Sequence, residues 1–187
     1  KNSRKYGNVN DMPLSLPERE FPAYSYVPGM FPHPLRDPAG HSFGATVESC
    51  QPLTTENARQ HKEYLWGIQL FNQGYYWEAH EAWELVWHAS GRQGATADYL
   101  KGLIKLAAAG VKTREGRPEG VARHSRRAAE LFREVQGSLV AENGSPFGLP
   151  LNSLLSTAEQ IAAHREDYRN TSQAPVVKTL PSLPERL

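Results

Sequence analysis

One short segment of the chain concentrates the side chains that could do chemistry. Residues 75–88 read YYWEAHEAWELVWH and hold three of the four tryptophans, two histidines and three glutamates. At 100° per residue, His80, Glu84 and Trp87 share one stripe of a helix, and Glu81 lies beside it. A helix this aromatic must be buried over much of its circumference, so we expect a buried His/Glu/Trp cluster whose charged groups are paired, neutralised or bound to a metal ion.

Two known metal-enzyme patterns do not fit this segment. The zincin pattern requires a second histidine where Glu84 stands, one helical turn after His80. Carboxylate-bridged di-iron bundles require two helices that each carry Glu-x-x-His, and the sequence contains no such pair. A looser site for a divalent metal, with His80 and Glu84 as ligands, fits the spacing. His124, His61 or a histidine of the N-terminal segment could complete its ligand set.

Two interpretations without metal stay open. In a structural network, His80 and Glu84 bond each other or a lysine of the following helix, where Lys105 sits among apolar residues. In a small-molecule pocket, Glu84 serves as ligand or base and His80 as its partner. The catalytic candidates are then His80, Glu81 and Glu84, and the pocket candidates are Trp83, Trp87, Lys105 and His124. The residue pattern does not decide whether the protein is an enzyme.

The elements that must position these side chains are helices. Apolar residues recur with helical spacing, and no segment alternates with the period of two that is typical of strands. With Thr54 or Thr55 as the first N-cap, the spacing predicts helices over residues 54–74, 75–89, 96–116, 118–137 and 152–168. We therefore expect an all-α fold, a compact helical bundle of about five helices with short connections.

Proline marks both ends of the chain. Eight of the 14 prolines lie before residue 54, and three more lie after residue 170. Because proline removes backbone donors and disfavours helix in the residue before it, we expect extended segments there. The sequence thus divides into a proline- and aromatic-rich N-terminal arm (1–53), a bundle domain (54–169) and a short C-terminal tail (170–187). We expect the arm to act as a lid that contributes His33, Arg36 or His41 to the cluster.

The overall composition excludes several classes of protein. Lysine and arginine number 21 against 20 acidic residues, so no global charge draws the chain to nucleic acid or to an anionic membrane. Mean hydropathy is −0.59, and no apolar run approaches the ~20 residues of a membrane-spanning helix. The single cysteine, Cys50, excludes a disulfide framework and zinc sites that need two thiolates. We expect a cytoplasmic protein that does not bind nucleic acid.

Two adjacent helices resemble the signature of a known family. His80, Glu81, Glu84 and Trp87 form an H-E-x-x-E-x-x-W helix, and a G-L-I-x-L-A-A helix begins at Gly102. This pair resembles the domain-of-unknown-function family 309, over about residues 57–131. The resemblance implies an all-α fold of small helical proteins and no settled biochemical activity. Lys105 stands where glutamine is the commoner residue of the family.

The residues together favour a helical-bundle protein whose His80/Glu81/Glu84 cluster binds a small-molecule ligand or a divalent metal ion. The alternative is a non-enzymatic interaction or scaffold module, in which the cluster only orients helices. Its arms would then dock onto a partner or onto a second copy of the chain, so a homo-oligomer is compatible with this alternative.

Overall fold

The computed structural model describes residues 19–46, 49–138 and 144–184. Over these ranges the chain forms a short 3-10 helix, η2 (Ala58–Gln60), and five α-helices: α1 (Lys62–Asn72), α2 (Tyr76–Ala89), α3 (Ala95–Arg114), α4 (Pro118–Ser138) and α5 (Leu151–Ala163). The same ranges contain no strand, so the predicted all-α fold and bundle of about five helices are confirmed. No helix among them is both long and apolar enough to cross a membrane.

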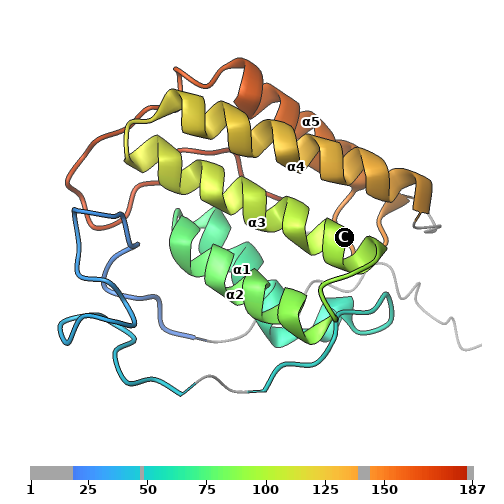
Figure 1. Ribbon diagram of the computed structural model, residues 1–187, viewed down its shortest axis with the longest axis horizontal. Helices are drawn as coiled ribbons and strands as arrows, with labels where there is room; N and C mark the ends of the chain where they lie inside the picture. Colours follow the sequence, from blue (N-terminus) through green and yellow to red (C-terminus); the bar gives the residue numbers. More distant parts are fainter. Residues whose placement is uncertain (1–18, 47–48, 139–143, 185–187) are drawn as a thin grey trace, which may run out of the picture.

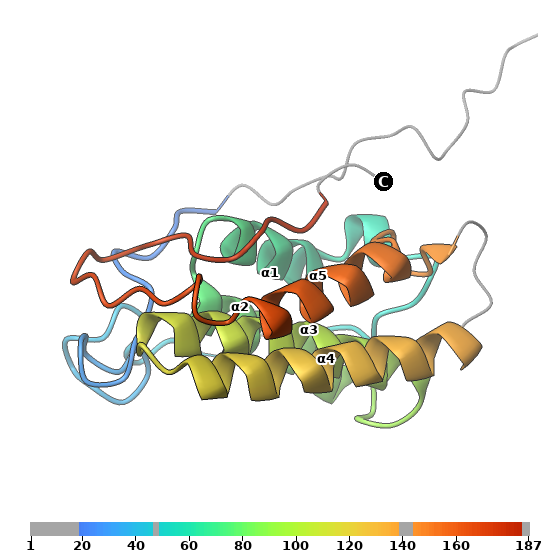
Figure 2. The ribbon, with the colours of Figure 1, turned by 90° about the horizontal axis from the view of Figure 1, so that it is seen from above.

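The long helices α3 and α4 pack side by side through the middle of the bundle (Figure 1). α2 packs against the other flank of α3, α1 pairs with α2, and α5 lies along α4 (Figure 2). α2 is therefore held between α1 and α3. Its core row of Ala79, Trp83 and Val86 is fully buried there. This row fixes the rotation of α2 and so decides which of its polar side chains face outward.

Two glycines determine how closely the helices approach. A Cβ atom on Gly67 of α1 would lie 2.2 Å from Nε1 of Trp83, and one on Gly102 of α3 would lie 2.5 Å from the ring of Phe132 on α4. Distances this short do not occur between packed side chains, so a larger residue would push the helices apart. Gly102 of the family signature is thus a packing position.

The first predicted helix starts later than expected. Thr54 does not begin it but closes a turn, in which its Oγ1 accepts the N–H of Asn57 at 3.3 Å. α1 begins at Lys62 because His61 is extended, with ψ at 100°, and its side chain accepts the N–H of Tyr64. The last predicted helix ends earlier, at Ala163, and residues 164–168 form turns instead.

The arm segment, residues 19–46, lies across α1 and the start of α2 of the same chain. Arg19 forms an ion pair with Glu63 of α1, with Nη1 2.9 Å from Oε2. The ring of Phe21 lies 5.1 Å from that of Trp66 and 5.2 Å from that of Tyr75. The predicted arm also includes residues 1–18, which lie outside the described residues.

The tail segment, residues 170–184, is attached by polar side chains that it covers. Asn72 accepts the N–H of Leu183 at 2.7 Å and donates to its carbonyl at 3.0 Å. The buried Arg114 donates to the carbonyls of Ser172 and Ala174, at 3.1 and 2.7 Å. These contacts hold an otherwise extended chain against α1 and α3.

The arm segment and the tail segment meet on the same side of the bundle. Figure 1 shows them close together at the ends of α1 and α3. The N–H of Ser25 donates to the carbonyl of Pro175 at 3.0 Å. Segments from opposite ends of the sequence therefore complete one surface.

Candidate functional site

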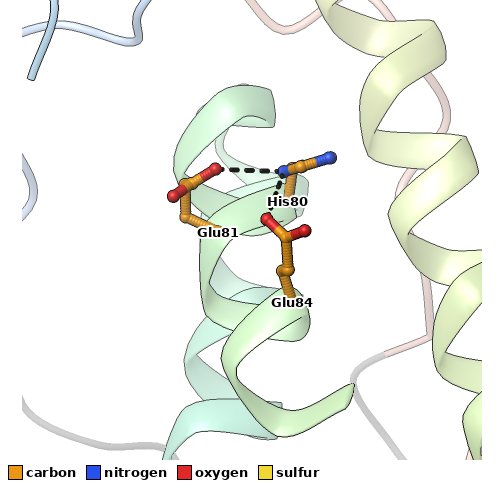
Figure 3. Close-up of side chains that lie close together, drawn as sticks. All are labelled: His80, Glu81 and Glu84. Carbon is orange, nitrogen blue, oxygen red and sulfur yellow. Dashed lines mark hydrogen bonds and ion pairs between the residues drawn. The ribbon is translucent and has the colours of Figure 1, made fainter. Parts of the chain in front are cut away.

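His80, Glu81 and Glu84 lie together on α2 and form the His80/Glu81/Glu84 cluster. Nδ1 of His80 is 3.3 Å from Oε1 of Glu81 and 3.9 Å from Oε2 of Glu84 (Figure 3). One ligand atom from each residue can be chosen so that all three lie within 4.8 Å of one another. The helix accounts for this, since positions one turn apart are neighbours on its surface.

The cluster is half-buried, whereas a buried cluster was expected. The side chains of His80, Glu81 and Glu84 are 29%, 37% and 40% exposed. The reason is the rotation of α2, which directs its alanine, tryptophan and valine row into the core and leaves the cluster at the rim. An ion pair this exposed contributes at most about 1 kcal/mol. The cluster is therefore dispensable for folding and accessible to an ion or ligand.

A cavity of about 670 Å³ lies between the arm segment and the α1–α2 pair. Glu81 and Glu84 of the cluster line it, together with Glu63, Glu78 and His41. Its volume falls within the range of small-molecule sites, about 300–1,000 Å³. We call it the acidic cavity, because four carboxylates from the described part of the chain line it. Two carboxylates thus belong both to the cluster and to the wall of this cavity.

The buried carboxylate of α2 is that of Glu78, which is 7% exposed. Its Oε1 accepts the N–H of Tyr26 at 2.9 Å and lies 3.1 Å from Nε2 of His41. Its Oε2 is buried and has no hydrogen-bond partner among the described residues. The pattern of α2 does not single out Glu78, because its burial depends on the arm segment. The one sequence signal is its position one turn before Glu81.

Of the three arm residues expected to reach the cluster, His41 lines the acidic cavity and the other two do not. Oγ of Ser42 lies 2.9 Å from Nδ1 of His41, a contact that orients the ring so that Nε2 faces Glu78. His33 instead packs on Trp77, with ring centroids 5.5 Å apart. Arg36 is exposed on the arm segment.

The four predicted pocket residues lie away from the acidic cavity. Trp83 is completely buried in the core. Trp87 is half-buried on the α3 side of α2, where Nζ of Lys101 lies 6.0 Å from its ring centroid. Lys105 on α3 and His124 on α4 are close enough for the charge of one to affect the pKa of the other. The structure thus brings the cluster to the cavity but not these four side chains.

His124 lies in a positively charged environment. Burial, followed by the charges of Lys105, Arg123, Lys112 and His80, lowers the pKa of His124 to about 4. The ring is therefore neutral at pH 7, and protonating it in the folded chain is unfavourable.

We expect His124 to make the protein less stable in mild acid. Between pH 6.5 and 4 the unfolded chain binds a proton at this histidine and the folded chain does not, so stability falls as the pH falls. With allowance for solvent screening, the loss between pH 7.5 and 5 is about 1 kcal/mol. Denaturant unfolding of His124→Gln should show a pH slope smaller by that amount. Equal pH slopes for His124→Gln and wild type would contradict this origin.

These features define an all-α domain in which one aromatic helix presents a histidine and several carboxylates beside a cavity. The family model described as "Domain of unknown function (DUF309)" matches residues 64–124. Residues 64–124 are therefore similar to this family, and the resemblance of the two helices is confirmed. The match spans most of α1, all of α2 and α3, and the start of α4. No curated protein matches the chain.

Proposed function

We propose that the protein binds a divalent metal ion through the His80/Glu81/Glu84 cluster and a small-molecule ligand in the adjoining acidic cavity. The observation that carries this proposal is the double role of Glu81 and Glu84, which belong to the cluster and also line the cavity. A metal ion held there would lie at the wall of a ligand-sized space. Such an ion would act as a Lewis acid or activate a water molecule.

The ligand set favours a first-row transition metal. One imidazole and two carboxylates are suited to manganese, iron or zinc, since imidazole binds zinc and iron well and carboxylates bind manganese. Metal-to-ligand bonds of about 2.0–2.2 Å require ligand atoms roughly 3 Å apart. Nδ1 of His80 and Oε1 of Glu81 lie 3.3 Å apart, and Oε2 of Glu84 lies 3.9 Å from the same nitrogen. Three protein ligands leave further positions for water or a bound molecule.

We also propose a cytoplasmic location, which agrees with the single cysteine. Burial, with a smaller contribution from the charge of Glu63, raises the pKa of the Cys50 thiol to about 11, so this cysteine is not a reactive thiolate. Fractionation of cells that express the full-length protein tests the location.

Removal of single ligands should abolish metal uptake without unfolding the chain. We expect metal-free wild type to take up one manganese, iron(II) or zinc ion per chain and to gain thermal stability from it. His80→Ala and Glu84→Gln should bind the same ion more than about 100-fold more weakly. Because the ion pair in the cluster contributes at most about 1 kcal/mol, both variants should remain folded. Calorimetric titration and elemental analysis provide the measurements.

His164→Ala and Glu166→Gln serve as matched controls. Both residues are exposed beyond the end of α5, where His164 lies 3.6 Å from Asp167, and neither belongs to the cluster. Their metal uptake should equal that of wild type. The proposal fails if wild type takes up no stoichiometric ion, or if the control substitutions weaken uptake as much as the cluster substitutions. In either case the His80/Glu81/Glu84 cluster is not the metal site.

A further inference from the structure

A serine, a histidine and a glutamate meet at the wall of the acidic cavity. Oγ of Ser42 lies 2.9 Å from Nδ1 of His41, and Nε2 of the same ring lies 3.1 Å from Oε1 of Glu78. All three residues line the cavity. A hydroxyl, an imidazole and a carboxylate joined in this order are the parts of an activated serine nucleophile. These three residues are separate from the His80/Glu81/Glu84 cluster.

The carboxylate of Glu78 determines which nitrogen of His41 carries the proton. A carboxylate only accepts hydrogen bonds, so Nε2, the nitrogen that faces it, is the N–H donor. In the neutral ring Nδ1 is then the acceptor, and the hydroxyl of Ser42 donates to it. The ring is therefore oriented as a general base for this hydroxyl. The two nitrogens have exchanged the places they have in serine proteases, but the proton follows the same path.

The arm segment holds His41 and Ser42 in a fixed turn. The side chain of His41 is 10% exposed, and the edge of the Tyr24 ring packs on it with centroids 4.7 Å apart. The N–H of Ser42 donates to the carbonyl of Pro34 at 3.2 Å. A Cβ atom on Gly40 would lie 2.4 Å from the same carbonyl oxygen, so the turn requires glycine there. A base and a nucleophile that are held in place need little reorganisation to react.

The cavity beside Ser42 is suited to a small molecule that carries no negative charge. Its four carboxylates lower the local concentration of anions, and the side chains of Leu35, Leu70 and Leu85 give it apolar wall. The N–H of Gly44, two residues after Ser42, makes no hydrogen bond within the described part of the chain. It is available to an oxygen that gains negative charge during a reaction.

We infer that Ser42 is the nucleophile of an esterase site, with His41 as its general base and Glu78 as the residue that positions the ring. Oγ of Ser42 attacks the carbonyl carbon of a carboxylic ester, and the hydroxyl proton passes to Nδ1 of His41. The bond to the alcohol oxygen then breaks, and this proton leaves with the alcohol. Water attacks the acyl group on Ser42 in turn, gives one proton to Nδ1, and the carboxylic acid departs as Oγ regains that proton. Ester and water become acid and alcohol.

An uncharged fluorophosphonate tests the nucleophile directly. Oγ of Ser42 displaces fluoride from phosphorus, its proton passes to His41, and a stable phosphonyl serine remains. The full chain is labelled in EDTA, and the modified residue is identified by mass spectrometry. We expect one label per chain, on Ser42, in the folded protein and none there in urea. Ser42→Ala should remove this label, and Ser153→Ala, at an exposed serine of α5, should not.

Two further variants separate the base from the residue that positions it. His41→Gln has no base and should label at least about 100-fold more slowly. Glu78→Gln can donate to Nε2, which places the ring proton on Nδ1, so the limiting rate of labelling should fall by about 100-fold or more. The reagent concentration that gives half this rate should stay unchanged, a split that general loosening of the arm segment would not produce. If Glu78→Gln does not fold, His41→Gln decides.

Two esters test the substrate class. 4-Nitrophenyl acetate should be hydrolysed with a kcat/KM at least about tenfold above that of the anionic 4-nitrophenyl hemisuccinate, because the carboxylates of the cavity repel the second ester. Ser42→Ala should lose the difference. Equal hydrolysis of both esters by wild type would overturn the assigned substrate class.

An unlabelled Ser42 in the folded protein would overturn the inference, as would labelling of folded His41→Gln at the rate of wild type. The inference goes beyond the proposed function and does not require the metal ion. Metal uptake without labelling of Ser42 leaves the metal proposal standing and removes the inference. Labelling in EDTA of a chain that takes up no metal ion does the reverse.

Discussion

Trp83→Ala is expected to lower the free energy of unfolding by about 3–5 kcal/mol, the usual loss when a fully buried aromatic side chain is truncated. The Trp83 side chain is 0% exposed and lies 5.9 Å from the ring of Phe71. Its Nε1 also donates to the carbonyl of Tyr64 at 3.1 Å, so the substitution removes a hydrogen bond between α1 and α2 as well. Denaturant unfolding measures the loss.

A second substitution identifies the cause of that loss. Gly67→Ala in the wild-type background should destabilise by about 1–3 kcal/mol, because its Cβ would collide with Trp83. In the Trp83→Ala background the collision is absent, and the higher helix propensity of alanine should stabilise by up to about 1 kcal/mol. A change of sign between the two backgrounds is the expected result. A loss of the same size in both would show that the contact between Gly67 and the Trp83 ring does not limit the packing of α1 on α2.

Tyr76→Phe is expected to cost about 2–4 kcal/mol and to release the tail segment. The Tyr76 hydroxyl accepts the N–H groups of Thr179 and Leu180, at 2.8 and 2.7 Å. Burial raises the pKa of Tyr76, so the hydroxyl stays protonated throughout the ordinary pH range. Phenylalanine leaves two backbone donors without an acceptor, each at a cost of about 1–3 kcal/mol unless water reaches it. Water can do so only if the tail segment moves away.

Hydrogen exchange distinguishes release of the tail from general loosening. The amides of Thr179 and Leu180 should exchange faster in Tyr76→Phe, while the amides of α4 should keep their relative protection. Tyr168→Phe, which removes a half-buried hydroxyl without these two partners, serves as the control. Unchanged protection at Thr179 and Leu180 in the Tyr76→Phe protein would contradict this role of the hydroxyl.

The helices could be predicted where their boundaries depend on local chemistry. α4 begins at Pro118 as expected, because proline is suited to the first turn of a helix. Its apolar face, formed by Val121, Ala128, Leu131 and Val135, is fully buried. The predicted start of the first helix was wrong, because Thr54 is suited to a turn as well as to a helix cap. The backbone of His61 is extended, so α1 begins only after it.

The part of the candidate site that depends on local helix geometry could also be predicted. His80, Glu81 and Glu84 meet because they lie within about one turn of a single helix, a relation that the sequence alone determines. Both the burial of Glu78 and the contact of His41 with it depend on the position of the arm segment. The arm has no periodic sequence pattern from which this position could be predicted. Trp83, one of the pocket candidates, lies in the buried core row of α2.

The contact between Ser25 and Pro175 links the acidic cavity to the order in which the chain is made. The arm segment that roofs the cavity leaves the ribosome before any of the helices on which it rests. Its contact with Pro175 becomes available only when the tail segment has been synthesised and has docked over Asn72 and Arg114. The helical wall of the cavity can therefore form before its roof, which is secured only after the tail segment has been synthesised.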